Sequence, residues 1–285
     1  MIKHSLFNCK VMKKKQVMLV TGASSGMGKD FALRLIKEGH MVYGAARRID
    51  KMNDIEKAGG KAIQMDVIEA DQVKACVEQI IEEEGRIDVL INNAGYAVYG
   101  AVETVSIEDA KRQFDVNIFG LAQITKEVLP HMRAQKNGKI INISSVGGKI
   151  FTPMGAWYHA TKHALEGWSD CLRLELAPFG IDVVIIEPGV IKTEFGDVMY
   201  QPMVDRSKGT PYQDLSKKLA DATLEVYSND QASDPKVITD LVVDAVKAKK
   251  PKTRYAAGYM AKPLLTARKL LSDRMFDKII MSQVN

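Results

Sequence analysis

The stretch that decides the fold is Val17-Met18-Leu19-Val20-Thr21-Gly22-Ala23-Ser24-Ser25-Gly26-Met27-Gly28. An apolar run is followed at once by a turn with three glycines, and an amphipathic segment from Phe31 to Ile36 comes next. Glycines permit a tight turn and let the backbone approach a pyrophosphate, whose charge the N-terminus of the next helix would meet. The spacing differs from GxGxxG, so the turn by itself fits an ordinary tight loop as well as a cofactor loop.

The same alternation of apolar runs and helix-length segments continues along the chain. Further runs typical of buried strands lie at residues 41–43, 62–63, 89–91, 140–143, 183–186 and 253–257. Strands that alternate with helices indicate βαβ units and a parallel sheet covered on both faces. We therefore predict an α/β, doubly wound, Rossmann-type three-layer sandwich in a single domain, with its ligand at the carboxyl ends of the strands.

The alternation also divides the chain. Residues 1–15 are predicted to be a flexible basic extension, and residues 16–285 a dinucleotide-binding oxidoreductase domain. The pattern weakens at about 190–235, where a polar stretch with two short helical pieces is predicted to be a substrate loop. A helical tail follows at about 258–285.

Composition excludes several classes of protein. The formal charge is +5, and the first 15 residues alone hold five lysines and no acidic residue. Basic ends around an acidic body do not form the concentrated basic face that binds nucleic acid, so we expect no nucleic-acid partner. Cys9, Cys76 and Cys171 lack the spacing of a disulfide framework or a zinc site, which predicts no metal and a reducing compartment. Because no signal peptide and no membrane span is evident, we predict a cytoplasmic protein.

The end of the second strand decides between NAD and NADP. An acidic residue there would bind the ribose 2′-hydroxyl, whereas a basic residue would accommodate a 2′-phosphate. Here the strand runs from Val42 to Ala46, and Arg47 and Arg48 follow. We therefore predict NADP in preference to NAD, although Asp50 lies nearby and one arginine could simply be solvated.

Tyr158 and Lys162 lie near the start of a predicted helix that runs to about Leu176. Residues four apart share a helix face, so phenol and ammonium can point into one cleft. A neighbouring cation lowers the pKa of a tyrosine from its usual value near about 10, and the pair could then exchange a proton with a substrate oxygen. Ser144 and Ser145 end the fifth strand, and either could polarise a carbonyl or be a turn or cap residue.

Taken together, these motifs resemble the short-chain dehydrogenase/reductase family, and most closely its 17β-hydroxysteroid dehydrogenase-like branch. The resemblance covers nearly the whole chain from about Gln16 onward. The matching segments are the TGxxxGxG turn, Asn92-Asn93-Ala94-Gly95, Asp115-Val116-Asn117, the Ser145/Tyr158/Lys162 set, and Pro188-Gly189 followed by Thr193.

The resemblance implies a role for each matching residue. It selects Ser145 as the residue that polarises the carbonyl and Tyr158 as the general acid and base. Lys162 would bind the nicotinamide ribose and lower the pKa of the tyrosine, and Asn117 would support a water-linked proton relay. The implied cofactor-binding positions are Gly22, Ser24, Ser25, Gly26, Met27, Arg47, Arg48, Asp66, Val67, Asn93, Ala94, Gly95, Tyr158, Lys162, Pro188, Gly189 and Thr193. A homodimer or homotetramer built on the helices before and after the fifth strand is also implied.

The leading hypothesis is hydride transfer between NADP(H) and a fairly hydrophobic secondary alcohol, ketone or aldehyde. Two alternatives stay open: a non-catalytic NADP(H)-sensing protein, and a lipid or retinoid reductase on a membrane surface. The second rests on the tail, where Leu264, Ala267, Leu271 and Met275 recur at helical spacing beside basic residues. We expect this stripe to pack against protein, and we expect His159 and His163 to be surface or packing residues.

Overall fold

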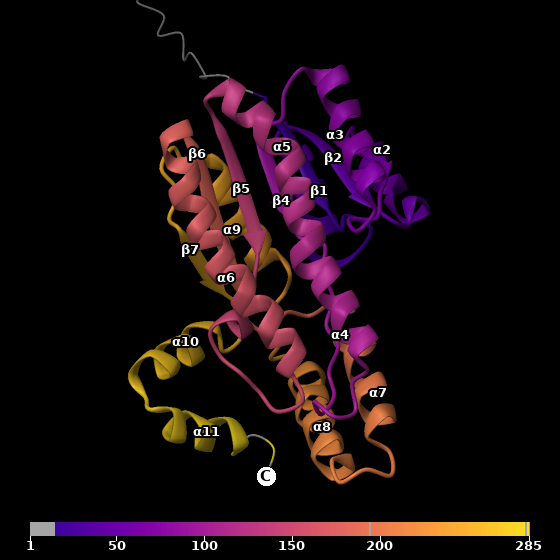
Figure 1. The fold of residues 1–285 in the computed structure, drawn as a ribbon, viewed down its shortest axis with the longest axis vertical. Coiled ribbons are helices and arrows are strands. Elements are labelled where there is room, and N and C mark those ends of the chain that lie inside the picture. The colour runs from indigo at the N-terminus through magenta and orange to yellow at the C-terminus, as the bar shows by residue number, and fades with distance from the viewer. Residues whose placement is uncertain (1–14, 194, 283, 285) are drawn as a thin grey trace, which may run out of the picture.

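Parallel strands form one sheet through the middle of the molecule, in the order β3-β2-β1-β4-β5-β6-β7 (Figure 1). The computed structural model describes residues 15–193, 195–282 and 284, so the predicted extension of residues 1–15 lies outside the described residues except for Lys15. The strands are β1 Val17–Thr21, β2 Met41–Ala46, β3 Lys61–Gln64, β4 Val89–Asn92, β5 Gly138–Ile143, β6 Ile181–Pro188 and β7 Arg254–Ala257. The predicted doubly wound α/β fold is confirmed.

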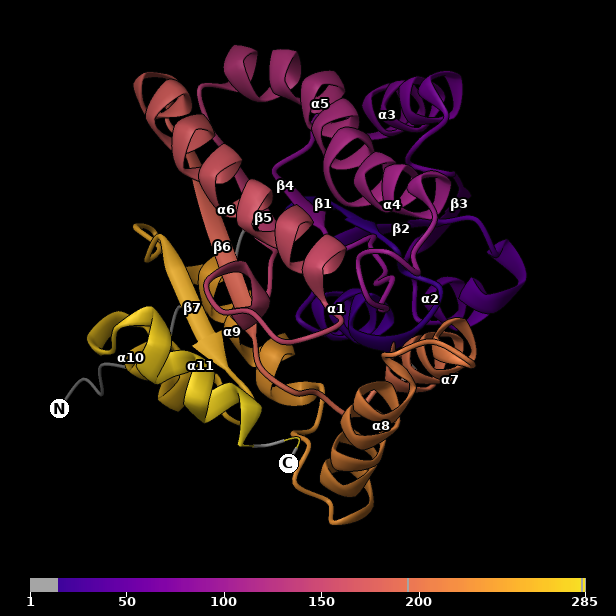
Figure 2. The same cartoon turned by 60° about the horizontal axis from the view of Figure 1, so that its bottom comes forward.

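Helices cover both faces of the sheet (Figure 2). The α-helices are α1 Gly26–Lys37, α2 Asn53–Lys57, α3 Ala70–Glu84, α4 Ile107–Phe114, α5 Leu121–Gln135, α6 Ala156–Leu176, α7 Phe195–Ser207, α8 Gln213–Ser228, α9 Lys236–Lys247, α10 Ala261–Leu270 and α11 Asp273–Met281. The shorter helical segments are η1 Ile49–Met52, η2 Asp115–Gly120, η3 Val146–Gly148 and η4 Ala177–Phe179.

A hydrophobic core lies on each face of the sheet, because successive side chains of a strand point to opposite faces. In β1, Met18 and Val20 pack with Phe31 of α1 and Val242 of α9. Leu19 belongs to the core on the other face, which includes side chains of α3, α5 and α6. Strands buried on both faces read as continuous apolar runs, which is why the sequence located them.

The strand order reverses between β1 and β4, which is where a doubly wound sheet binds its ligand. The excursion after β6 and the C-terminal helices lie at the same carboxyl end of the sheet (Figures 1 and 2). Within the excursion, the two predicted short helical pieces are two full helices, α7 and α8, of 13 and 16 residues.

The predicted apolar stripe of the tail is interrupted. The chain turns between α10 and α11, and the buried residues of α11 are Phe276 and Ile280, while Met275 is 54% exposed. These buried residues pack against Val146 and Ile150, directly after the fifth strand. Leu264 and Ala267 of the predicted stripe also pack against this cluster, so the tail packs against protein as expected, while Met275 is exposed. Within the described residues, no helix is long and apolar enough to span a bilayer.

Candidate active site

The turn after β1 forms a tight cradle. Gly22 and Gly26 have φ angles of +68° and +52°, which glycine adopts readily. A Cβ on Gly28 would clash with the side chain of Asn93 and the carbonyl oxygen of Gly22. The Asn93 side chain in turn donates to the carbonyl oxygen of Thr21 at 3.0 Å. The turn therefore leaves its backbone open to a phosphate while it is held firmly against the segment after β4.

Positive charge lies beside this turn. The Arg48 guanidinium donates to the hydroxyls of Ser25 at 3.1 Å and Ser24 at 3.4 Å, and both Arg47 and Arg48 are exposed. The first turn of α1 holds no acidic residue, so the positive potential of its N-terminus adds to the charge of the arginines. Cradle, helix N-terminus and guanidinium together fit a dinucleotide that carries an additional phosphate.

The other predicted cofactor positions lie along the same sheet edge. Asp66 and Val67 follow β3, and the Asp66 carboxylate accepts from the backbone N–H of Ile68 at 3.3 Å. Pro188 ends β6, and Gly189 after it donates its backbone N–H to the carbonyl oxygen of Ala257 at 2.8 Å. Thr193 comes four residues later, and a Cβ on Gly26 would lie 3.9 Å from the Cβ of Thr193. Thr193 therefore lies beside the glycine turn.

Tyr158 and Lys162 share the face of α6 that looks into this edge. The Lys162 ammonium lies 6.0 Å from the centre of the Tyr158 ring and donates to the carbonyl oxygen of Ile143 at 2.9 Å. Both side chains are about 9% exposed. The Tyr158 phenol and the Lys162 ammonium therefore lie close together in a buried site, as their spacing in the sequence predicted.

Burial changes the pKa values of this pair in a way that the sequence did not predict. The pKa of Tyr158 is raised, mainly by burial, and a hydrogen bond with the Ser145 side chain lowers it in part. Burial also lowers the pKa of Lys162 to about 8, and the negative charge of Glu166 opposes that shift. The expectation that the lysine brings the phenol below its usual pKa is thus wrong for the protein alone, because both groups are desolvated.

The two serines after β5 have different surroundings. Ser145 is half-buried, is hydrogen-bonded to Tyr158, and caps η3 by accepting from the N–H of Gly147 at 3.0 Å. Ser144 is 3% exposed, and its backbone N–H continues the sheet by donating to Ile186. Ser145 is therefore both a cap and a neighbour of the tyrosine.

Asn117 lies inside a π-helical segment between α4 and α5. Its side chain donates to the carbonyl oxygen of Tyr96 at 2.9 Å and to the Thr161 hydroxyl at 3.1 Å, and accepts from the Tyr96 N–H at 3.1 Å. These bonds tie the loop after β4 to α6 beside Tyr158 and Lys162. Such π-helical turns occur frequently at functional sites.

Sequence reasoning missed the apolar cover over Tyr158. Tyr99 lies with its ring centre 5.7 Å from that of Tyr158, and Met199 and Met203 of α7 belong to the same buried cluster. The spacing of four between the two methionines was the only available signal, and it is common to any helix with a buried face.

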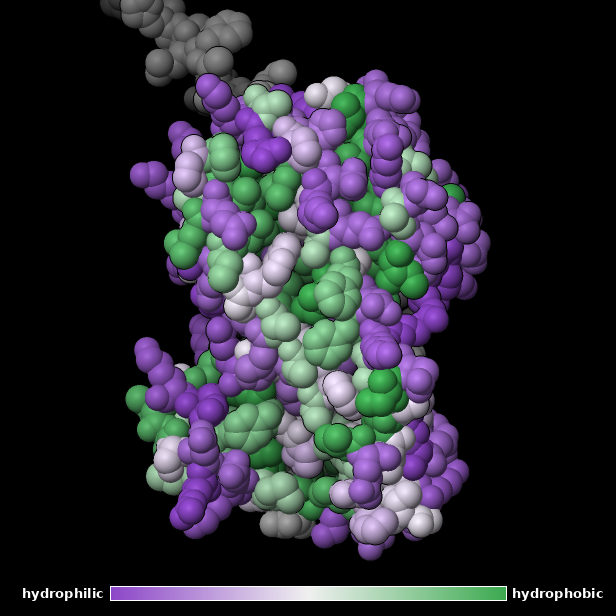
Figure 3. Space-filling model, viewed as in Figure 1, coloured by the Kyte–Doolittle hydropathy of each residue, from purple (hydrophilic) through white to green (hydrophobic). Residues whose placement is uncertain are grey.

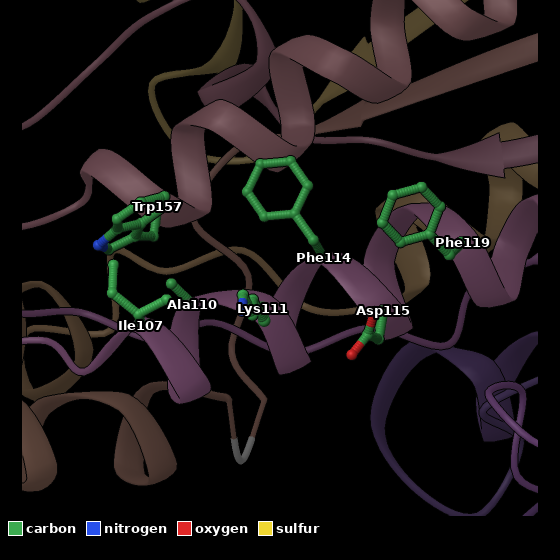
Figure 4. A pocket seen from close by; sticks show the side chains of 7 residues that line it. All are labelled: Ile107, Ala110, Lys111, Phe114, Asp115, Phe119 and Trp157. Atoms are coloured by element: carbon green, nitrogen blue, oxygen red, sulfur yellow. The ribbon is translucent and has the colours of Figure 1, made fainter.

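An apolar groove of about 310 Å³ lies on a different face, where Ile107 and Trp157 lie beside each other (Figure 4). Ile107 and Phe119 are 54% and 61% exposed. Hydrophobic side chains form a band along this side of the molecule, over α4 and the first turns of α6 (Figure 3). Phe114 meets Trp157 edge to face at 6.5 Å between ring centres. The groove is separate from the cluster over Tyr158.

Residues 16–202 match the model of the short chain dehydrogenase family. The chain belongs to this family. It is 46% identical over 182 residues to the 3-ketodihydrosphingosine reductase of Bacteroides thetaiotaomicron, a match that spans 64% of this chain and 66% of that relative.

Solved structures of other proteins share the fold. A short-chain dehydrogenase from Streptomyces avermitilis is 34% identical with a TM-score of 0.78, covering 93% of this chain and 95% of that one. A variant of an actinorhodin polyketide ketoreductase with NADPH is 30% identical with a TM-score of 0.72, covering 85% and 94%. This short-chain dehydrogenase is therefore an NAD(P)-dependent oxidoreductase.

Proposed function

We propose that this enzyme transfers a hydride between NADP(H) and a hydrophobic secondary alcohol, ketone or aldehyde. The observation that carries the proposal is the buried meeting of Tyr158, Ser145 and Lys162 at the sheet edge, beneath an apolar cover. NADPH, when bound, supplies the hydride in the reductive direction. The side chains of the protein position the substrate and transfer the proton.

In that direction Tyr158 donates its proton to the oxygen of the substrate carbonyl. Its raised pKa keeps the phenol protonated at neutral pH, which suits a general acid. The Ser145 hydroxyl donates a second hydrogen bond to the same oxygen as charge develops on it. Lys162 binds the nicotinamide ribose, and its positive charge stabilises the phenolate left behind. Asn117 holds the surrounding backbone and supports the return of a proton to Tyr158.

NADP is the proposed cofactor. Its 2′-phosphate would lie on Arg48 with Ser24 and Ser25, and Arg47 would add charge. The pyrophosphate would bind to the glycine turn, at Gly22, Gly26 and Met27. The adenine would contact Asp66 and Val67. Asn93, Ala94, Gly95, Pro188, Gly189 and Thr193 would line the nicotinamide end. A ketoreductase of similar structure was solved with NADPH, which supports this choice.

The substrate is proposed to be apolar around its carbonyl. The segment at about 190–235 would serve as its cover, since α7 and α8 supply methionine and leucine side chains to the cluster around Tyr158. The similarity to a 3-ketodihydrosphingosine reductase favours a ketone on a long aliphatic chain. Membership of the 17β-hydroxysteroid dehydrogenase-like branch, and a cytoplasmic location, stay predictions.

We also propose a homodimer or homotetramer. The groove between α4 and α6 is the apolar surface that a second copy would cover, because exposed Ile107 and Phe119 would otherwise face water. The resemblance implies a contact on the helices before and after β5, which are α5 and α6, and α6 supplies Trp157 to this groove. Light scattering of the wild type and of Phe119→Asp gives the test: the wild type should be an oligomer and the variant a monomer.

The test of the function is NADPH oxidation with ketones and aldehydes of increasing chain length, together with steroids and retinoids. The wild type should turn over the apolar ketones, and Tyr158→Phe should lower kcat about 100-fold or more. Tyr255→Phe, the same substitution on β7, is the matched control and should keep wild-type activity. Full activity in Tyr158→Phe would contradict the mechanism, and NADPH binding without turnover of any substrate would favour the sensing alternative.

A further inference from the structure

His159, the residue after Tyr158, is buried and hydrogen-bonded at both ring nitrogens. Its Nδ1 lies 2.8 Å from the carbonyl oxygen of Gly147, which can only accept, so Nδ1 carries the proton. Its Nε2 lies 3.1 Å from the backbone N–H of Thr152, which can only donate, so Nε2 is the acceptor. The two backbone partners therefore define one neutral tautomer. Burial, which lowers the pKa of His159, agrees with it.

The chain of hydrogen bonds continues towards the substrate side. Because Nε2 accepts, the Thr152 hydroxyl, 3.0 Å away, also donates to it. The Thr152 side chain is also hydrogen-bonded to the phenol of Tyr99. Burial raises the pKa of Tyr99 and keeps that phenol a donor. Hydrogen bonds thus link Tyr99, Thr152, His159 and Gly147 one after another.

Two members of this series of hydrogen bonds lie against the proposed catalytic tyrosine. The ring centres of Tyr99 and His159 each lie 5.7 Å from that of Tyr158. Glycine makes room for the imidazole on both sides, since a Cβ on Gly147 would lie 3.0 Å from Nδ1 and one on Gly155 2.6 Å from Cδ2. The imidazole therefore joins both ends of the segment between Ser145 and Tyr158.

We propose that His159 is a positioning residue of this enzyme: as the neutral imidazole it clamps the segment from Ser145 to Tyr158 and, through Thr152, fixes the Tyr99 phenol against the catalytic ring. The proposal rests on the proposed function of Tyr158 as the proton donor. Misplacement of a reacting group by about 1 Å can cost about 100-fold in rate, so the clamp acts on kcat. Most of the proposed NADPH contacts, on the glycine turn and Arg48, lie away from the clamp, so its loss should change NADPH affinity far less than kcat.

The experiment compares kcat, KM and the NADPH dissociation constant of His159→Phe, Thr152→Val and Tyr99→Phe with the wild type. We expect kcat to fall about 100-fold in His159→Phe and about 10-fold in the other two, with NADPH affinity within about 2-fold. If the residues form one chain, Thr152→Val should add little in a His159→Phe background. His163→Phe, an exposed histidine one turn along α6, is the matched control and should keep wild-type kcat.

Thr152→Val keeps the shape of the side chain and stays informative where His159→Phe fails to fold. A kcat in Thr152→Val within about 2-fold of the wild type, or a loss of NADPH affinity equal to the loss of kcat, would overturn the proposal. ¹⁵N NMR of the imidazole tests the clamp without any turnover: a proton on Nδ1 supports it, and a proton on Nε2 overturns it. A wild type without activity but with Nδ1 protonated would contradict the proposed function and not the clamp.

Discussion

The proposed cofactor edge and the proposed substrate cover of this enzyme are built from different kinds of contact. The turn after β1 is held by directed hydrogen bonds among glycines, Thr21 and Asn93. The cover over Tyr158 consists of Met199, Met203 and other apolar side chains of α7 and α8. These side chains make hydrophobic contacts, which have no preferred direction. Directed contacts recognise one fixed chemical group, whereas flexible methionines adapt to guests of different shape. In the proposed function, the first region therefore selects the cofactor and the second a class of substrates.

The largest effect is expected from a substitution of Gly28 in the turn after β1. A Cβ there would clash with Asn93 and Gly22, so Gly28→Ala displaces the turn. We expect NADPH binding to be lost and kcat/KM to fall by more than about 100-fold, measured by fluorescence titration and steady-state kinetics. Gly167→Ala is the matched control, because a Cβ there meets open space. Normal NADPH binding by Gly28→Ala would mean that the turn is not the cofactor site.

Arg48 tests how specific the cofactor edge is. Arg48→Ala removes a charge-assisted hydrogen-bond donor to the proposed 2′-phosphate, so kcat/KM for NADPH should fall about 10- to 100-fold while that for NADH stays unchanged. Lys51→Ala removes another exposed cation nearby and should leave both values as they are. Equal losses with the two cofactors would refute the assignment of Arg48.

Met203 tests the tolerance of the substrate cover. It is fully buried in the cluster around Tyr158, so Met203→Ala opens space and lowers stability by about 2–5 kcal/mol. The ratio of kcat/KM between a bulky and a small ketone should rise about tenfold, with no change in NADPH affinity. Met275→Ala, at a half-exposed position on α11, should leave the ratio unchanged. An unchanged ratio in Met203→Ala would show that α7 does not shape the substrate site.

The smallest effect is expected where the two regions meet, at Lys162. Its pKa of about 8 means that the ammonium is kept below that pH and lost above it, so kcat/KM should fall as pH rises through about 8. Glu166→Gln removes a charge that raises this pKa and should move the fall to lower pH. Asp170→Asn, which also removes a carboxylate paired with Arg254, is the control and should leave the fall in place. A pH profile that does not move in Glu166→Gln would contradict this electrostatic account.

The features that could be predicted from the sequence are those that depend on a local pattern of residues. Buried strands read as apolar runs, the glycine turn needs backbone freedom, and Tyr158 and Lys162 are four residues apart on one helix. The sequence could not give the pKa directions, because those depend on how deeply the fold buries both groups. Nor could it identify His159 as a buried link, since its partners come from a loop whose path only the tertiary structure defines.

The most direct test of the central claim is a crystal structure of the enzyme with NADPH. We predict the nicotinamide ring beside the hydroxyls of Ser145 and Tyr158, the ribose on Lys162, and the 2′-phosphate on Arg48. A nicotinamide ring bound away from Tyr158 would contradict this prediction.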